Sequence, residues 1–246
     1  MRPLLRVLAL LGILLLASTT AQAATLRLVA DSWPPFTDAN MANGGLATAI
    51  VTTALTRAGY TSQYQQVPWA RALLGVGDGR YDVLVNAWYN DSRTEIGQFS
   101  AGYLTNRIRL LKRKGDAVRF NALSDLYPFP VAVVRDYAYS PEFDSDANLQ
   151  KIPVRSFSVA VGMLAAGRVR LALEDEFVAG YYLKREPKEV REAVEFFDRP
   201  VSENSLHILV SLKNPEHQQI VAGFDRAIAQ MKADGSYARL LKQHGM

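Results

Sequence analysis

The sequence contains no cysteine among its 246 residues and only three histidines. The absence of cysteine excludes a disulfide scaffold, a cysteine nucleophile and a lipid anchor attached to cysteine. The spacing of His207, His217 and His244 fits no metal site. No Gly-x-Ser-x-Gly or His-Glu-x-x-His motif occurs, and the glycine-rich stretch 75–79 follows a predicted helix rather than a strand, unlike a dinucleotide-binding fingerprint. We therefore expect a protein that is not an enzyme and needs no cofactor or metal.

An excess of one charge sign is also missing. The chain has 28 lysines and arginines against 24 aspartates and glutamates, and two of the arginines belong to the N-terminal leader described below. The remaining chain is nearly neutral with interspersed signs, which excludes the basic stripe that nucleic-acid binding requires. Without disulfides, stability has to come from a large hydrophobic core, which roughly 220 residues can form as one domain or as two lobes.

The N-terminus predicts export. Arg2 and Arg6 precede an unbroken apolar run at 8–17, and Ala21–Ala23 has the small-x-small pattern that signal peptidase cleaves. A run of about ten residues is too short to span a bilayer core of roughly 30 Å. We expect residues 1–23 to be a cleaved signal peptide, with an uncleaved membrane anchor as the alternative. The mature protein is then expected to be a soluble monomer in the periplasm.

The first part of the mature chain alternates short strands with amphipathic helices. Pro68 is well placed to begin one of these helices, and Gly59 to end another. The third strand is apolar enough to be central in a parallel sheet. This β-α-β-α-β order predicts an open, mostly parallel sheet with helices on both faces. The strands are expected at 26–30, 62–67 and 82–87, and the helices at 45–57 and 69–76.

A second α/β unit follows the basic turn at 112–115. Its strands are expected at 130–134, 152–154, 169–173 and 194–197, with helices at 157–166 and 176–184. A late strand at 207–211 then leads into closing helices at 215–231 and 236–244.

The closing helices have no strand left to cover in the second unit, so we expect them to return to the first. Residues 24–110 and 206–246 then form lobe 1, and residues 111–205 form lobe 2. The chain crosses twice, near 110–114 and near 201–206, and two crossings make a hinge that can close a cleft. The alternative is a single continuous α/β domain.

Ligands of open α/β sheets bind beyond the carboxyl ends of the strands, so the residues that follow each strand are the candidates for the site. Trp33 and Phe36 follow the first strand as large aromatic rings on a stiff loop, where they can cover a ligand or pack down as loop anchors. Trp69 and Arg71 follow the second strand. Arg71 lies in the first turn of a helix, where the dipole disfavours a cation unless an anion is near.

The third strand ends in a polar and aromatic cluster. Asn86 offers a donor and an acceptor, Trp88 offers a flat apolar face, and Arg93 offers a planar fork that can hold a carboxylate. The alternative for Arg93 is an ion pair with Asp91 or Glu95.

In the second unit, the candidates follow two strands. Arg135 and Tyr137 follow the strand at 130–134, and three successive acids follow the strand at 169–173. Acids also stabilise helix N-termini. We assign that role to Glu176 and expect Asp175 to contact the ligand.

With these residues in this order, the chain resembles the periplasmic solute-binding proteins of ABC importers, in the branch that includes polar amino-acid binders (family 3). The resemblance covers nearly all of the mature chain, and it depends on the order and spacing of several motifs. These are Trp33–Phe36, Gly79–Asp82, Arg93 with the stretch 99–103, Gly167–Val169 leading to Asp175, and the C-terminal stretch 232–241.

The resemblance implies a two-lobed periplasmic-binding-protein fold of type II. It also implies that the protein delivers its ligand to an ABC permease in the inner membrane. It implies that Trp33 stacks on the ligand, that Arg93 clamps the carboxylate of an amino acid, and that Asp175 accepts from its ammonium group. Residues around Asn86–Trp88 complete the first-lobe wall.

Two departures from the family pattern bear on the ligand. Arg135, Asp136 and Tyr137 stand where amino-acid binders usually have a glycine-rich turn, and Glu174 rather than a small residue precedes Asp175. Together, Arg71, Arg93 and Arg135 would suit a ligand with additional negative charge. Two other functions stay open, namely a dehydratase-like periplasmic enzyme of the same fold and a soluble sensor for a membrane partner.

Overall fold

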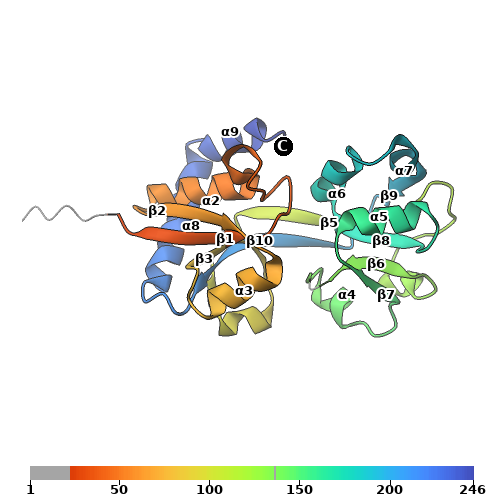
Figure 1. Ribbon diagram of the computed structural model, residues 1–246, viewed down its shortest axis with the longest axis horizontal. Coiled ribbons are helices and arrows are strands. Elements are labelled where there is room, and N and C mark those ends of the chain that lie inside the picture. The colour runs from red at the N-terminus through yellow and green to blue at the C-terminus, as the bar shows by residue number, and fades with distance from the viewer. Residues whose placement is uncertain (1–22, 136) are drawn as a thin grey trace, which may run out of the picture.

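The computed structural model describes residues 23–135 and 137–246. Residues 1–22 of the predicted signal peptide lie outside the described residues, and so does Asp136. Figure 1 shows two α/β lobes joined by a pair of long strands. The described strands belong to one sheet, whose main path runs β2-β1-β3-β10-β5-β8-β6-β7, with β4 paired to β10 and β9 paired to β5. The predicted α/β class with mostly parallel strands within each lobe is confirmed.

The first lobe contains β1 (Thr25–Ala30), β2 (Thr61–Gln66) and β3 (Val83–Trp88), all parallel. Every residue of β3 is buried, while β2 alternates between exposed and partly exposed residues at the sheet edge. This matches their sequences, because a central strand of a covered sheet is apolar on both faces. Around them lie the 3-10 turns η1 (Ala42–Gly44) and η2 (Asp91–Glu95), the helices α2 (Leu46–Arg57) and α3 (Trp69–Gly77), and the short strand β4 (Gly97–Phe99).

The second lobe contains β6 (Val131–Val134), β7 (Lys151–Val154) and β8 (Leu171–Asp175), again parallel. The helix α5 (Phe157–Ala165) packs on this sheet, and α6 (Glu176–Leu183) begins directly where β8 ends. The remaining elements are η3 (Leu123–Leu126), α4 (Pro141–Ser145), α7 (Lys188–Ala193) and β9 (Val194–Phe196).

Two strands connect the lobes, namely β5 (Leu104–Arg113) and β10 (Ser202–Ser211). They pair antiparallel over Leu104–Ile108 and Ser202–Leu206. The segment expected to cross, 110–114, instead pairs at 110–112 with β8 in the second lobe, so β5 begins earlier than the sequence predicted. The first half of β5 is rich in polar residues, so the hydropathy pattern did not predict a strand there. The lobe boundaries expected from the sequence stay a prediction.

The chain ends with α8 (His217–Ala233) and α9 (Ser236–Gln243), which return to the first lobe and pack against α2 (Figure 1). An Arg57–Asp234 ion pair of 2.6 Å joins α2 to the end of α8. Within residues 23–135 and 137–246, no helix has the length and apolar character needed to cross a bilayer.

Candidate functional site

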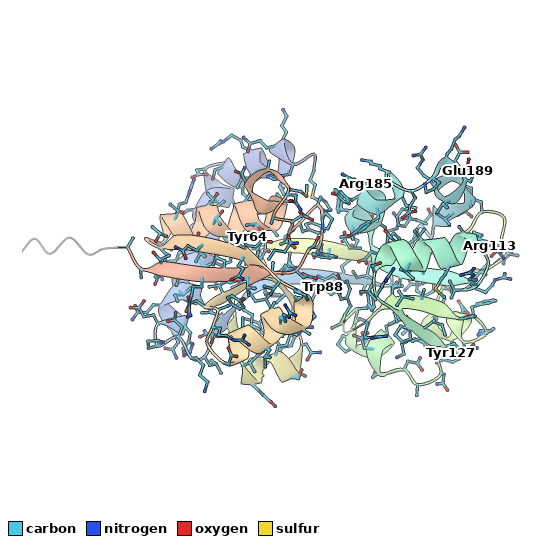
Figure 2. The ribbon with its side chains drawn as sticks, in the orientation of Figure 1. Tyr64, Trp88, Arg113, Tyr127, Arg185 and Glu189 are labelled. Atoms are coloured by element: carbon cyan, nitrogen blue, oxygen red, sulfur yellow. The ribbon has the colours of Figure 1, made fainter. Side chains whose placement is uncertain are left out.

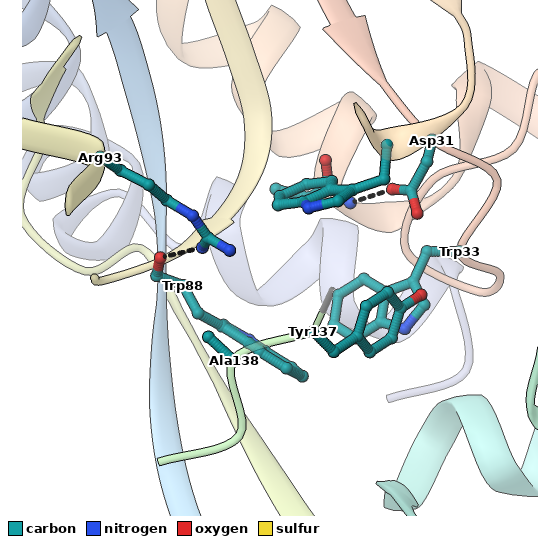
Figure 3. A pocket seen from close by; sticks show the side chains of 8 residues that line it. Asp31, Trp33, Trp88, Arg93, Tyr137 and Ala138 are labelled. Atoms are coloured by element: carbon teal, nitrogen blue, oxygen red, sulfur yellow. Dashed lines mark hydrogen bonds between the residues drawn. The ribbon is translucent and has the colours of Figure 1, made fainter. Parts of the chain in front are cut away.

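A small cavity lies where the carboxyl ends of β1 and β3 face the loop after β6. Figure 3 shows the side chains that line it, which come from both lobes. Six of the ten site residues predicted from the sequence line this cavity, because parallel strands end at the same edge of a sheet. They are Trp33, Trp69, Asn86, Trp88, Arg93 and Tyr137, and Asp31 and Ala138 complete the lining.

Arg93 lies on η2 with only 8% of its surface exposed. Its Nη1 donates a 2.7 Å hydrogen bond to the carbonyl oxygen of Trp88, and its guanidinium carbon lies 5.0 Å from the centre of the Trp69 ring. Across the described chain it forms no ion pair, so the alternative pairing with Asp91 or Glu95 does not occur. Burial lowers the pKa of Arg93, partly offset by the charge of Asp144. In Figure 3 its guanidinium points into the pocket.

Aromatic rings surround the central cavity. The rings of Trp33 and Trp88 meet edge to face at 5.4 Å, and Trp88 meets Tyr137 of the second lobe at 6.0 Å. Phe36 is 1% exposed, lies 4.6 Å from Trp33 and does not line this cavity, so it has the position of a loop anchor. With the rings in this arrangement, the cavity measures only about 20 Å³.

Asn86 and Asp31 form a buried polar pair on the first-lobe wall. The side-chain Nδ2 of Asn86 donates a 2.9 Å hydrogen bond to Oδ1 of Asp31. The Oδ1 of Asn86 has no hydrogen-bond partner among the described residues. Burial raises the pKa of Asp31, and the bond from Asn86 partly opposes this. The sequence reasoning omitted Asp31, although it is the first polar residue after β1 and so stands at the predicted place for a ligand.

The three acids at the end of β8 have different partners. Asp175 is fully buried and caps α6, because its Oδ1 accepts from the backbone N–H groups of Phe177 and Val178 at 2.9 and 3.0 Å. Glu176 lies in the first turn of α6, as expected for an acid that stabilises a helix N-terminus, but it is not the capping residue. The N-cap residue has a non-helical backbone that lets its side chain reach back to these N–H groups, whereas Glu176 is already helical and pairs with Arg109 at 3.2 Å.

Glu174, which the sequence reasoning left outside the site, opens onto the interlobe space. It lines a hollow of about 300 Å³ together with Asp31, Trp33 and Tyr137. Only 1% of its surface is exposed. Burial raises the pKa of Glu174 to about 8, with a further contribution from the charge of Asp175. Desolvation likewise raises the pKa of Asp175 to about 6.

Of the three arginines expected to act together, Arg93 and Arg135 line one hollow of about 630 Å³, and Arg71 does not line it. Arg71 is exposed on the first turn of α3 and does not line the cavity. Arg135 is exposed as well, and it lines two wider hollows beside the cavity. Only Arg93 is buried at the centre of the site. In the part of the chain that the structure describes, no group of three or more acids and histidines is placed to hold a metal ion.

Comparisons with known proteins bear on the family and the fold of the chain. The family model described as bacterial extracellular solute-binding proteins, family 3, matches residues 26–246. No curated protein sequence matches the chain.

Among solved structures with the same fold is the substrate-binding protein of an amino acid ABC transporter, with a TM-score of 0.71 and 17% identity over 90% of this chain and 99% of that one. A histidine kinase sensor domain similar to periplasmic binding proteins has a TM-score of 0.75 and 18% identity, covering 91% and 97%. An ancestral amino-acid-binding protein, a precursor of cyclohexadienyl dehydratase, has a TM-score of 0.70 and 22% identity, covering 91% and 96%. At these identities the likeness establishes the fold, which is the predicted type II periplasmic-binding-protein fold.

Proposed function

The chain belongs to family 3 of the bacterial extracellular solute-binding proteins, and from that premise we propose that it captures a small polar solute bearing a carboxylate. The solute is an amino acid or a related compound, held between the lobes in the periplasm after removal of the signal peptide. The protein acts as a monomer and passes its ligand to an ABC permease in the inner membrane.

The carboxylate is inferred from Arg93. Burying a guanidinium without a paired anion is costly, and its fork matches a pair of anionic oxygens such as those of a carboxylate. Arg93 forms no ion pair among the described residues, although the more distant charge of Asp144 acts on it, and one of its N–H groups already holds the Trp88 carbonyl. The buried indole N–H of Trp69, directly beneath the guanidinium, also has no partner in the described chain and is a further donor for the ligand.

Movement of the lobes completes the site. The central cavity of about 20 Å³ has room for roughly one water molecule, while Arg93 also lines a wider hollow of about 630 Å³ between the lobes. Since the paired strands β5 and β10 join the lobes, small backbone rotations there can open the cleft and close it over the ligand. A ligand that contacts both walls favours the closed state by its differential affinity.

The affinity expected of such a site is realistic. Micromolar binding needs about −8 kcal/mol. A bidentate arginine–carboxylate bond, a second charged hydrogen bond and an aromatic stack can supply this after the cost of ordering the ligand.

The experiment is isothermal titration calorimetry of the mature protein against single amino acids and dicarboxylates, with Arg93→Gln and Arg71→Gln compared. Arg71 is a matched control because it is exposed outside the cavity. We expect Arg93→Gln to weaken carboxylate binding about thirtyfold or more, and Arg71→Gln to leave it unchanged. Unchanged affinity in Arg93→Gln would contradict the proposal.

Two other roles use the same cleft. Glu174 retains a proton near neutral pH, since its pKa is about 8, and so has the property of a general acid in a dehydratase-like enzyme. Recovery of a bound ligand chemically unchanged after prolonged incubation, checked by mass spectrometry, supports binding over catalysis. A sensor role is distinguished by the gene neighbourhood, which would encode a histidine kinase rather than a permease with its ATPase.

A further inference from the structure

The side chain of Tyr137 divides the space between the lobes. Three adjoining hollows of about 20, 630 and 300 Å³ lie there, and among the described residues Tyr137 is the one that lines all three. Arg93 lines the first two hollows, whereas Glu174 lines only the third. The ring of Tyr137 therefore stands between the space in front of Arg93 and the space in front of Glu174.

Neighbouring side chains hold this ring across the gap between the lobes. Its centre lies 6.0 Å from that of Trp88 in the first lobe, edge to face, which is a favourable aromatic contact. Burial raises the pKa of Tyr137 well above its ordinary value, and the charges of Asp31 and Glu174 contribute to the rise. The ring thus contacts the first-lobe wall and lies close to the acids of the third hollow, and Figure 3 shows it in the pocket.

The backbone on both sides of Tyr137 is anchored independently of its ring. The N–H of Tyr137 donates a 3.3 Å hydrogen bond to the carbonyl oxygen of Val134 at the end of β6. Two residues later, the buried hydroxyl of Tyr139 accepts a 2.7 Å hydrogen bond from the N–H of Val134. The carbonyl oxygen of Tyr139 accepts from the side chains of Ser202 and Asn204 on β10. Removal of the Tyr137 ring should therefore leave the path of the chain in place.

We propose that Tyr137 determines the selectivity of the site by limiting how far a bound solute extends from Arg93. A solute whose carboxylate is held by Arg93 meets the ring before it reaches the hollow lined by Glu174. Since the ring is packed between both lobes, a longer solute has to displace it and lose its contacts. This deepens the proposed function and rests on it. The ligand class narrows to single amino acids and other compact carboxylates, with dipeptides excluded.

The first test is isothermal titration calorimetry with two pairs of probes, L-glutamine with glycyl-L-glutamine and L-glutamate with glycyl-L-glutamate. Each pair shares a carboxylate for Arg93, and the dipeptide is longer by one residue. We expect wild type to bind the amino acids more tightly. In Tyr137→Ala, the affinity for each dipeptide relative to its amino acid should rise about tenfold or more. Tyr137→Phe retains the ring and should retain the preference of wild type.

The second test needs no ligand. All three tryptophans of the chain line the central cavity, so acrylamide quenching of their fluorescence measures access to this space. Removing the ring joins the hollows, and the quenching constant of unliganded Tyr137→Ala should exceed that of wild type. Tyr127→Ala should leave it unchanged, because Tyr127 lines none of the three hollows and lies away from the junction of the lobes (Figure 2). Tyr137→Val takes the place of Tyr137→Ala if the alanine variant does not fold.

The outcomes distinguish the selectivity proposal from the proposed function. If the amino acids bind in an Arg93-dependent manner and the dipeptides bind wild type equally well, the selectivity proposal is wrong and the carboxylate function stands. An equal loss of affinity for both members of each pair in Tyr137→Ala makes Tyr137 a simple ligand contact and also overturns the proposal, as does unchanged quenching. If quenching rises but no probe binds any of the proteins, the carboxylate function is wrong and its selectivity falls with it.

Discussion

The indole N–H of Trp88 donates a 2.9 Å hydrogen bond to the side-chain oxygen of Asn106, deep within the strand that connects the lobes. Asn106 is fully buried on β5, and its Nδ2 donates in turn to Oδ2 of Asp175 at 3.1 Å. The side chain of Asn106 thus links the two lobes. It connects Trp88, which lies at the junction between the lobes in Figure 2, to Asp175, which caps α6 in the second lobe.

Replacing Asn106 with leucine is expected to destabilise the protein markedly. The substitution leaves the Trp88 N–H without its partner and removes a bond from a buried carboxylate, at a cost of about 1–3 kcal/mol for each unsatisfied group. Urea unfolding measures the change. Asn121→Leu is the control because this residue is exposed and hydrogen-bonds only through its backbone. An equal loss of stability in the two variants would contradict a specific role for Asn106.

Glu174 is expected to make the unliganded protein less stable as pH rises. Its pKa is about 8 in the folded protein, against an ordinary value of 4.5. Between these values the native state holds a proton that the unfolded state has released, so the free energy of unfolding falls with increasing pH. Glu174→Gln removes this dependence, and the variant should gain stability relative to wild type between about pH 5 and pH 8. If the free energies of unfolding of the two proteins, measured in urea, change in parallel with pH, the raised pKa of Glu174 is wrong.

Tryptophan fluorescence should report ligand binding without any label. The chain has three tryptophans, Trp33, Trp69 and Trp88, and all three line the central cavity. Closure over a ligand changes the surroundings of each ring, so emission should shift in proportion to the occupancy measured by calorimetry. Binding heat without any change in emission would place the ligand elsewhere on the protein.

Gly45 is expected to be necessary for the position of the aromatic loop. Its φ is +92°, and a Cβ there would lie 2.5 Å from the carbonyl oxygen of Phe36. Next to it, the N–H groups of Leu46 and Ala47 donate to the carbonyl oxygens of Pro35 and Phe36, which holds the loop that carries Trp33.

Gly45→Ala should therefore cost about 1–3 kcal/mol of backbone strain and more from the clash, and it should weaken ligand binding. Gly59→Ala separates the two effects, since Gly59 also has a φ of +92° but open space around it. Thermal unfolding and ligand titration of both variants distinguish the effect of the clash from the effect of the positive φ alone. Equal behaviour of the two alanine variants would exclude the clash as the cause.

Much of the fold followed from hydrophobic periodicity. The apolar strand β3 and the helix α2 lie within one residue of their predicted bounds, because a strand buried on both faces and an amphipathic helix leave clear patterns in the sequence. The first half of β5 did not follow, since its alternating polar residues are typical of an exposed segment and its pairing with β10 joins residues about a hundred positions apart.

The sequence by itself determined which side chains follow the strands, and because parallel strands end at one sheet edge, six of the ten nominated residues meet in one cavity. Only the tertiary structure decided how the charges are distributed among them. It left Arg71 and Arg135 exposed, buried Arg93 without an ion pair among the described residues, gave the helix cap to Asp175 and placed Glu174 and Asp31 on the same hollow. Burial and partners set the energy of a charge, and both depend on residues from the other lobe that no local pattern in the sequence specifies.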